Sequence, residues 1–184
     1  LFVCTAVAAF LGLETLGRWL AGRRRKIRER FHGEGWVLAV LVAVGIGLHN
    51  FGEGLAIGAA FSLGEVALGT VLIVGFTLHN TTEGLAIVSP LAKEDIRIRD
   101  LVQLGIIGGA PTIAGAWLGG FVYSPIWSVV FFAVGAGAIA QVIVQISRQM
   151  AGDASVSQHL ATVPVLTGLT TGFGIMYVTG LIVG

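Results

Sequence analysis

The sequence predicts an all-α, polytopic membrane protein of six transmembrane helices, and two observations carry this prediction. Hydrophobic residues make up 55% of the 184-residue chain and charged residues only 11%, whereas a water-soluble domain carries roughly a quarter charged residues. The apolar residues also gather in runs long enough to cross a bilayer, which takes about 20 residues in a helix. We therefore expect one transmembrane domain that comprises residues 1–184.

Six apolar runs follow one another along the chain, at residues 1–21, 36–62, 66–91, 101–122, 126–147 and 160–183. Each is interpreted as one spanning helix. Glycine recurs inside the runs, and in a bilayer small residues allow helix backbones to approach one another closely.

The segments between the runs mark the ends of each helix. The basic segment 22–34 follows the first run, and the turn 62–65 joins the second run to the third. The polar segment 92–100 precedes the fourth run, the turn 123–125 follows it, and residues 147–159 lead to the sixth. These segments are short, polar or marked by glycine and proline, as the connections of helical hairpins are.

The basic residues predict the orientation of the chain. All eleven lie in or beside the first, third and fifth connections: Arg18, Arg23, Arg24, Arg25, Lys26, Arg28, Arg30, Lys93, Arg97, Arg99 and Arg148. With six spans these connections lie on one side, and positive charge marks the cytoplasmic side. We therefore expect an integral protein of the plasma (inner) membrane with both ends of this chain outside, surrounded by lipid and without a nucleic acid partner.

The second and third runs contain a repeated polar motif, HNFGEG and HNTTEG. Each copy has a histidine, an asparagine and a glutamate at the same spacing: His49, Asn50, Glu53, His79, Asn80 and Glu83. Residues four apart share one face of a helix. Ionisable groups at this depth cost several kcal/mol unless they are paired or hydrated, so they are candidates for function.

The motif predicts a metal site. A short turn makes the two helices antiparallel neighbours, so their polar faces can meet. Two imidazoles and two carboxylates suit zinc, iron(II), manganese or cobalt, while calcium and magnesium prefer shells of oxygen alone. The two carboxylates would repel each other without a cation or a proton between them. A proton relay and a purely structural polar contact are the alternatives.

The two HNxxEG motifs, in consecutive spans after a basic connection, resemble the paired metal-binding helices of the ZIP (Zrt/Irt-like) family of divalent metal transporters. The six runs are similar to helices three to eight of that family's eight-helix bundle, with Ser89–Pro90 at the expected place in helix five. Helices one and two of the family have no counterpart in this sequence. The resemblance implies uptake of a divalent ion toward the cytoplasm, Zn²⁺ first, with Fe²⁺, Mn²⁺, Co²⁺ and Cd²⁺ as alternatives.

The resemblance also implies roles for the residues of the motif. His49, Glu53, His79 and Glu83 match the family's primary transport site. The two asparagines, Asn50 and Asn80, match a neighbouring second site that shares the two glutamates. Family members move one group of helices against another. The sequence neither requires nor excludes a homodimer.

One departure from the family's pattern concerns the number of ions. Members with two adjacent ions have a glutamate before a proline in helix six, where this chain has Ala110 before Pro111. The run 101–122 contains no acid at all. Glu53 and Glu83 balance one divalent cation, so we expect one ion per chain.

The main alternative from another class is a zinc-dependent intramembrane hydrolase, which needs an open metal position and a nearby base. The sequence contains no HExxH motif and no serine or cysteine that is paired with a base, so we expect no enzyme.

Outside the repeated motif, Glu14 is expected to pair with Arg18, four residues later. Gln141 and Gln145 are expected either to line a pathway or to bond between helices.

Overall fold

The computed structural model describes residues 1–22, 34–92, 95–151, 155 and 161–183, and every regular element in these residues is a helix. The helices are α1 (Phe2–Gly22), α3 (Glu34–Ser62), α4 (Val66–Val88), a short 3₁₀ turn η1 (Ser89–Leu91), α5 (Ile98–Phe121), α6 (Pro125–Ala151) and α8 (Val163–Val183). The prediction of an all-α chain is therefore confirmed.

Five of these helices are long and apolar enough to cross a membrane, judged by length and composition: Phe2–Trp19, Gly35–Ser62, Val66–Leu91, Ile98–Phe121 and Pro125–Arg148. The predicted sixth run forms α8, but its apolar part within the described residues, Val163–Ile175, is shorter. The described residues thus contain five candidate spans of a membrane protein, and the sixth span stays a prediction.

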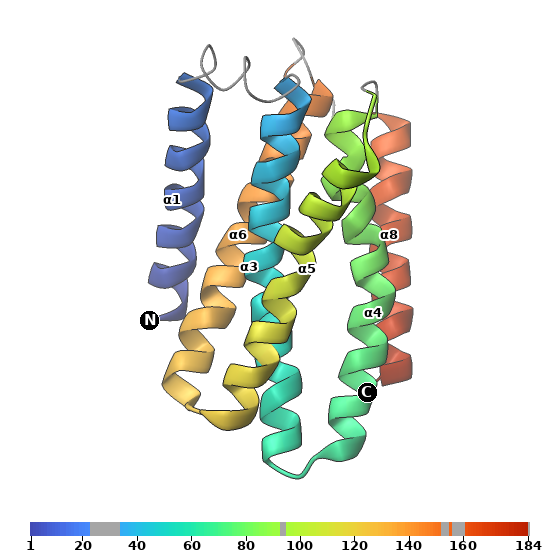
Figure 1. The fold of residues 1–184 in the computed structure, drawn as a ribbon. Helices are drawn as coiled ribbons and strands as arrows, with labels where there is room; N and C mark the ends of the chain where they lie inside the picture. The colour runs from blue at the N-terminus through green and yellow to red at the C-terminus, as the bar shows by residue number, and fades with distance from the viewer. Residues whose placement is uncertain (23–33, 93–94, 152–154, 156–160, 184) are drawn as a thin grey trace.

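The helices lie side by side and run alternately up and down, with α1 at one edge and α8 at the other (Figure 1). The central helix α3 packs against α4, α5 and α6, α1 packs mainly against α6, and α8 lies along α4. Of the basic residues, Arg18, Arg97, Arg99 and Arg148 belong to the described chain. The cluster 23–30 and Lys93 lie outside the described residues.

Helix ends differ from the predicted ones at two places that matter below. Helix α6, which was predicted to end at residue 147, continues to Ala151, so that Arg148 lies in its last turn and not in a connection. Helix α5, which was predicted to begin at residue 101, begins at Ile98. Near this end the Asp100 carboxylate accepts a hydrogen bond from the backbone N–H of Arg97 (3.3 Å).

Glycines bring α3 and α5 into backbone contact. A Cβ at Gly54 of α3 would collide with the carbonyl oxygen of Thr112, and a Cβ at Gly115 of α5 would collide with that of Phe51. Larger side chains at these positions would force the two helices apart. Small residues at the interfaces of membrane helices allow such close approach of the backbones. The register between α3, which carries the first motif, and α5 is therefore set by close packing.

The hairpin between α3 and α4 brings the two motifs to the same level. Its turn contains Gly64, whose φ of 80° lies in the left-handed region that favours glycine. The helices then run antiparallel, and a buried cluster of α3, α4, η1, α5 and α6 residues packs at one end of them: Ala39, Val42, Ala43, Ile46, Ile87, Leu91, Leu104 and Val142.

Candidate metal site

The two copies of the repeated motif face each other across the α3–α4 interface. His49 and Glu53 share one face of α3, and His79 and Glu83 share one face of α4, because each pair is four residues apart. The Glu53 Oε1 atom lies 2.5 Å from His79 Nε2 and 3.4 Å from His49 Nε2. His49 Nε2 also lies 3.8 Å from Glu83 Oε1. The structure therefore brings all four side chains together.

A metal ion could be held by this group. One ligand atom from each of His49, His79 and Glu83 lies within 4.8 Å of the others. Glu53, whose side chain is only 5% exposed, contacts both imidazoles. Tetrahedral zinc with ligands at 2.0–2.2 Å requires donor atoms roughly 3.4 Å apart. The His49–Glu53 and His49–Glu83 separations are already close to this value, while the His79–Glu53 contact would have to open to admit the ion.

The site faces a cavity of about 570 Å³. Residues of α3 and α4, which carry the glutamates, line this cavity together with residues of α6. The α6 wall contains only apolar residues: Phe132, Gly135, Ala136 and Ile139. A Cβ at Gly135 would lie 3.2 Å from the Cα atom of His49, so the glycine allows α6 to approach the motif. Sequence reasoning missed this wall, because apolar residues in an apolar helix carry no signal of function.

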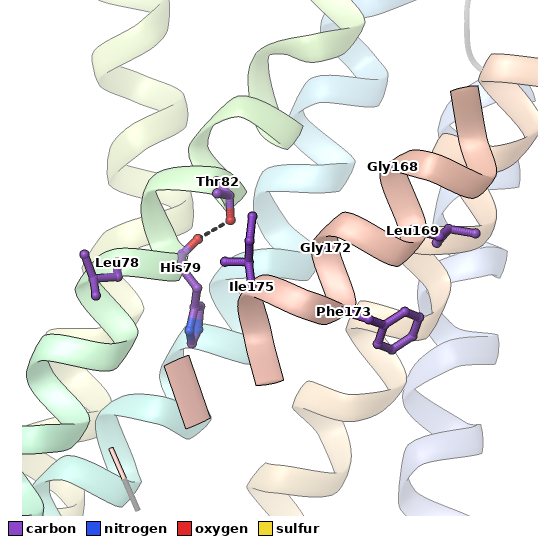
Figure 2. Close-up of a pocket in the computed structure, with 8 residues that line it drawn as sticks. All are labelled: Leu78, His79, Thr82, Gly168, Leu169, Gly172, Phe173 and Ile175. Atoms are coloured by element: carbon purple, nitrogen blue, oxygen red, sulfur yellow. Dashed lines mark hydrogen bonds between the residues drawn. The ribbon is translucent and has the colours of Figure 1, made fainter. Parts of the chain in front are cut away.

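A second cavity, of about 410 Å³, lies between α4 and α8 and reaches the same histidine (Figure 2). Its walls are Leu78, His79 and Thr82 of α4 and Gly168, Leu169, Gly172, Phe173 and Ile175 of α8. Thr82 donates a hydrogen bond to the carbonyl oxygen of His79 (2.6 Å), as Figure 2 shows. Both His79 and Thr82 also line the first cavity. His79 therefore lies between a cavity that contains the two glutamates and a cavity whose α8 wall has only apolar residues and glycines.

Among the described residues, histidines are the only basic side chains that contact the carboxylates of the site. Among the described residues that line the cavity, Glu53 and Glu83 are the only charged groups apart from the histidines. Within the described part of the chain, neither glutamate pairs with a lysine or an arginine. A buried carboxylate, Glu53, beside a second one that is half-buried, Glu83, is costly without a counter-ion. A divalent cation would neutralise both.

The two asparagines of the motif make different contacts. With its amide nitrogen turned toward the carboxylates, Asn80 donates to Glu83 Oε2 (3.0 Å) and to Glu53 Oε2 (3.3 Å). Asn50 instead donates to the backbone carbonyl of Gly108 on α5 (3.0 Å). The repeat in the sequence is therefore not repeated in the contacts.

Of the other predicted residues, Glu14 has a different main partner from the expected one. Its Oε1 lies 2.7 Å from Arg148 Nη1 and 3.9 Å from Arg18 Nε. Gln141, 1% exposed, donates to Glu14 Oε2 (3.4 Å) and so bonds between helices. The prediction that Arg18 is the partner was incomplete, because the sequence separation of Glu14 and Arg148 hides their contact. Ala110 is exposed on α5.

No protein-family model, curated protein or solved structure matches this chain. The resemblance to the ZIP transporters consequently rests on the pair of motifs and the order of the runs. The chemistry of the site rests on the contacts and cavities described above.

Proposed function

We propose that the protein transports a divalent transition-metal cation, Zn²⁺ first among the candidates, across the membrane toward the cytoplasm. The ion binds between α3 and α4, at His49, Glu53, His79 and Glu83. The observation that carries this proposal is the convergence of two imidazoles and two carboxylates, unbalanced by any described lysine or arginine, between apolar helices.

The depth of the group supports transport. His49 lies fourteen residues after the start and thirteen before the end of the apolar stretch Gly35–Ser62. His79 lies thirteen residues after the start and twelve before the end of Val66–Leu91. Both histidines are thus half-way along helices of membrane-spanning length. Substrate sites of transporters lie near this midplane, where a bound ion is separated from both aqueous sides.

The choice of ligands supports release as well as binding. Histidine and glutamate bind zinc only when deprotonated, so protons compete with the ion and weaken its binding. The described part of the site contains no thiolate, which would hold zinc more firmly; the chain's single cysteine, Cys4, lies exposed near the start of α1. Such a site suits an ion that must leave again.

In this proposal the chain belongs to the ZIP-like transporters, and α8 is a sixth span. Six alternating spans bring the first, third and fifth connections to one side, and all eleven basic residues of the sequence lie in or beside these connections. By the bias of lysine and arginine this side is cytoplasmic. The ends of this chain then lie outside.

The test is metal flux into proteoliposomes that contain the purified full chain. A trapped metal-sensitive dye should report entry of Zn²⁺, with Fe²⁺, Mn²⁺, Co²⁺ and Cd²⁺ as the panel. Glu53→Gln should abolish the flux, whereas the matched variant Glu14→Gln, an acid outside the site, should retain it.

Orientation is checked in a Cys4→Ser background with an impermeant thiol reagent on intact cells. A cysteine in place of Ser124 should be labelled and one in place of Ser155 should not. Equal flux through the wild-type protein and Glu53→Gln would contradict transport through this site. Cleavage of a membrane peptide without metal flux would favour the hydrolase.

A further inference from the structure

The turn of α5 around Pro111 lies against α3 at Gly47, two residues before the first motif. A proline inside a helix has no N–H for the carbonyl four residues earlier, which here is that of Ile107. A Cβ at Gly47 of α3 would collide with this oxygen and would lie 3.2 Å from Cγ of Pro111. The absence of a side chain at Gly47 thus allows α3 to pack directly on the backbone of this turn.

Asn50 makes the hydrogen bond between α3 and the same turn. It is three residues after Gly47 and so shares its helix face. Its Nδ2 donates to the carbonyl oxygen of Gly108 at 3.0 Å, and its side chain, 3% exposed, is almost completely buried. A carbonyl oxygen accepts hydrogen bonds only. The contact therefore requires a donor at position 50 and orients the amide of Asn50.

The orientation of Asn50 bears on two ligand residues of its own helix. His49 precedes it in the chain, and Glu53 follows one turn later. Its Oδ1 atom is buried and has no hydrogen-bond partner. Asn50 is thus the residue through which the ligand-bearing face of α3 is bonded to α5.

We propose that Asn50 is a positioning residue and not a primary metal ligand. By donating to the Gly108 carbonyl it fixes α3 against α5, and so fixes the direction in which His49 and Glu53 of α3 face. Asn80 has the other task, since it bonds the two carboxylates themselves. The inference rests on the proposed function only in that the site binds a divalent cation, and it holds whether or not that cation is transported.

The first test is the isosteric variant Asn50→Asp, which replaces the donor with an acceptor. The purified full chain in lipid nanodiscs is titrated with Co²⁺, whose absorption bands report its coordination, and Zn²⁺ affinity follows from displacement. Positioning predicts a loss of affinity of roughly 10- to 100-fold, as for other residues that orient metal ligands. A ligand at this position predicts tighter binding, because aspartate adds a negative charge. Equal or tighter binding by Asn50→Asp would overturn the proposal.

The control is Gln141→Ala, which removes another buried amide that bonds between helices but lies outside the site. It should lower the melting temperature and leave Co²⁺ affinity within about twofold, which separates a general loss of packing from an effect on the site. An equal loss of affinity in Gln141→Ala would show that the Asn50 effect is not specific, and would contradict the proposal.

A second test does not depend on the folding of Asn50→Asp. Asn50→Ala, Pro111→Ala and the double variant form a cycle, and residues in one contact network give non-additive effects. If Asn50 acts through the Pro111 turn, the loss of affinity in the double variant should be smaller than the product of the two single losses. Multiplicative losses would refute the link to α5. Transport assays on the same proteins separate this outcome from the proposed function, because a chain that binds the ion but does not move it would refute transport alone.

Discussion

Two groups of ionisable side chains lie between apolar helices, and they differ in how their charge is balanced. Between α1 and α6, Glu14 contacts Arg148 and Arg18, so one carboxylate meets two permanent cations. Between α3 and α4, Glu53 and Glu83 meet only histidines and amides. The first group is neutralised by arginines of the chain itself, whereas no lysine or arginine among the described residues pairs with the carboxylates of the second.

The positions of the two groups agree with this difference. Arg148 and Arg18 are mostly exposed, with 57% and 73% of their side-chain surface accessible, and lie toward the ends of their helices. Glu53 is buried at mid-helix and opens only to a cavity. Ion pairs near the surface contribute little to stability, while uncompensated buried charge is functional by default. The contrast distinguishes a contact that ties helices together from a group of side chains that could hold a metal ion.

The largest effect is expected from removing a carboxylate of the site. In Glu53→Gln or Glu83→Gln the amide keeps the shape but not the charge, and loss of one partner from a buried charged group costs about 3–5 kcal/mol. Zn²⁺ affinity should fall by at least about 100-fold, measured by competition with a fluorescent chelator in nanodiscs. If both variants bind Zn²⁺ within threefold of the wild type, the charges of Glu53 and Glu83 are not what binds the cation, and the contrast with the Glu14 group fails.

The next effect concerns a second ion. Two dications about 4 Å apart repel each other with about 4 kcal/mol even at the dielectric constant of water, four times the value for unit charges. Glu53 and Glu83 supply two negative charges, and the part of α5 beyond its first-turn Asp100 has none to add. Elemental analysis after dialysis against metal-free buffer should therefore find one zinc per chain. Two zinc ions per chain would mean that neutral ligands are enough to hold the second ion beside the first.

A smaller effect is expected from the packing that aligns the site. Gly115→Ala adds a methyl group that collides with the backbone of α3 at Phe51, and overpacking of this kind costs about 1–3 kcal/mol. The matched control is Gly105→Ala on the same helix, where nothing lies within 4 Å of the added Cβ. Melting in detergent should show a lower temperature for Gly115→Ala alone, together with weaker Zn²⁺ binding. Similar melting of both variants would show that α3 and α5 can separate without cost.

The smallest effect on zinc binding and stability is expected for Glu14→Gln, which removes the carboxylate that pairs with Arg148 and Arg18. Because its arginine partners are largely exposed, the loss of stability should be about 1 kcal/mol or less. Zn²⁺ affinity should stay unchanged in the same competition assay. A large loss of zinc binding in this variant would abolish the distinction between the two groups.

The cavities show where sequence reasoning reached its limit near the site. The facing of His49 and Glu53 toward His79 and Glu83 follows from their spacing and from a short hairpin turn, so it was predictable. The apolar wall of α6 at Gly135, and the hollow between His79 and the glycines of α8, were not. Apolar residues have the same pattern whether they face lipid, another helix or a cavity.

The sequence by itself determined the helices and the local faces of the chain, because the length of an apolar run and the spacing of four residues are properties of one segment. Only the tertiary structure decided which of two identical asparagines bonds the carboxylates and which bonds α5, since Asn50 and Gly108 are 58 residues apart. It likewise decided that Glu14 meets Arg148, 134 residues away, more closely than Arg18 on its own helix. Such contacts depend on how glycines let particular helices approach, and no periodicity within a single helix encodes that choice.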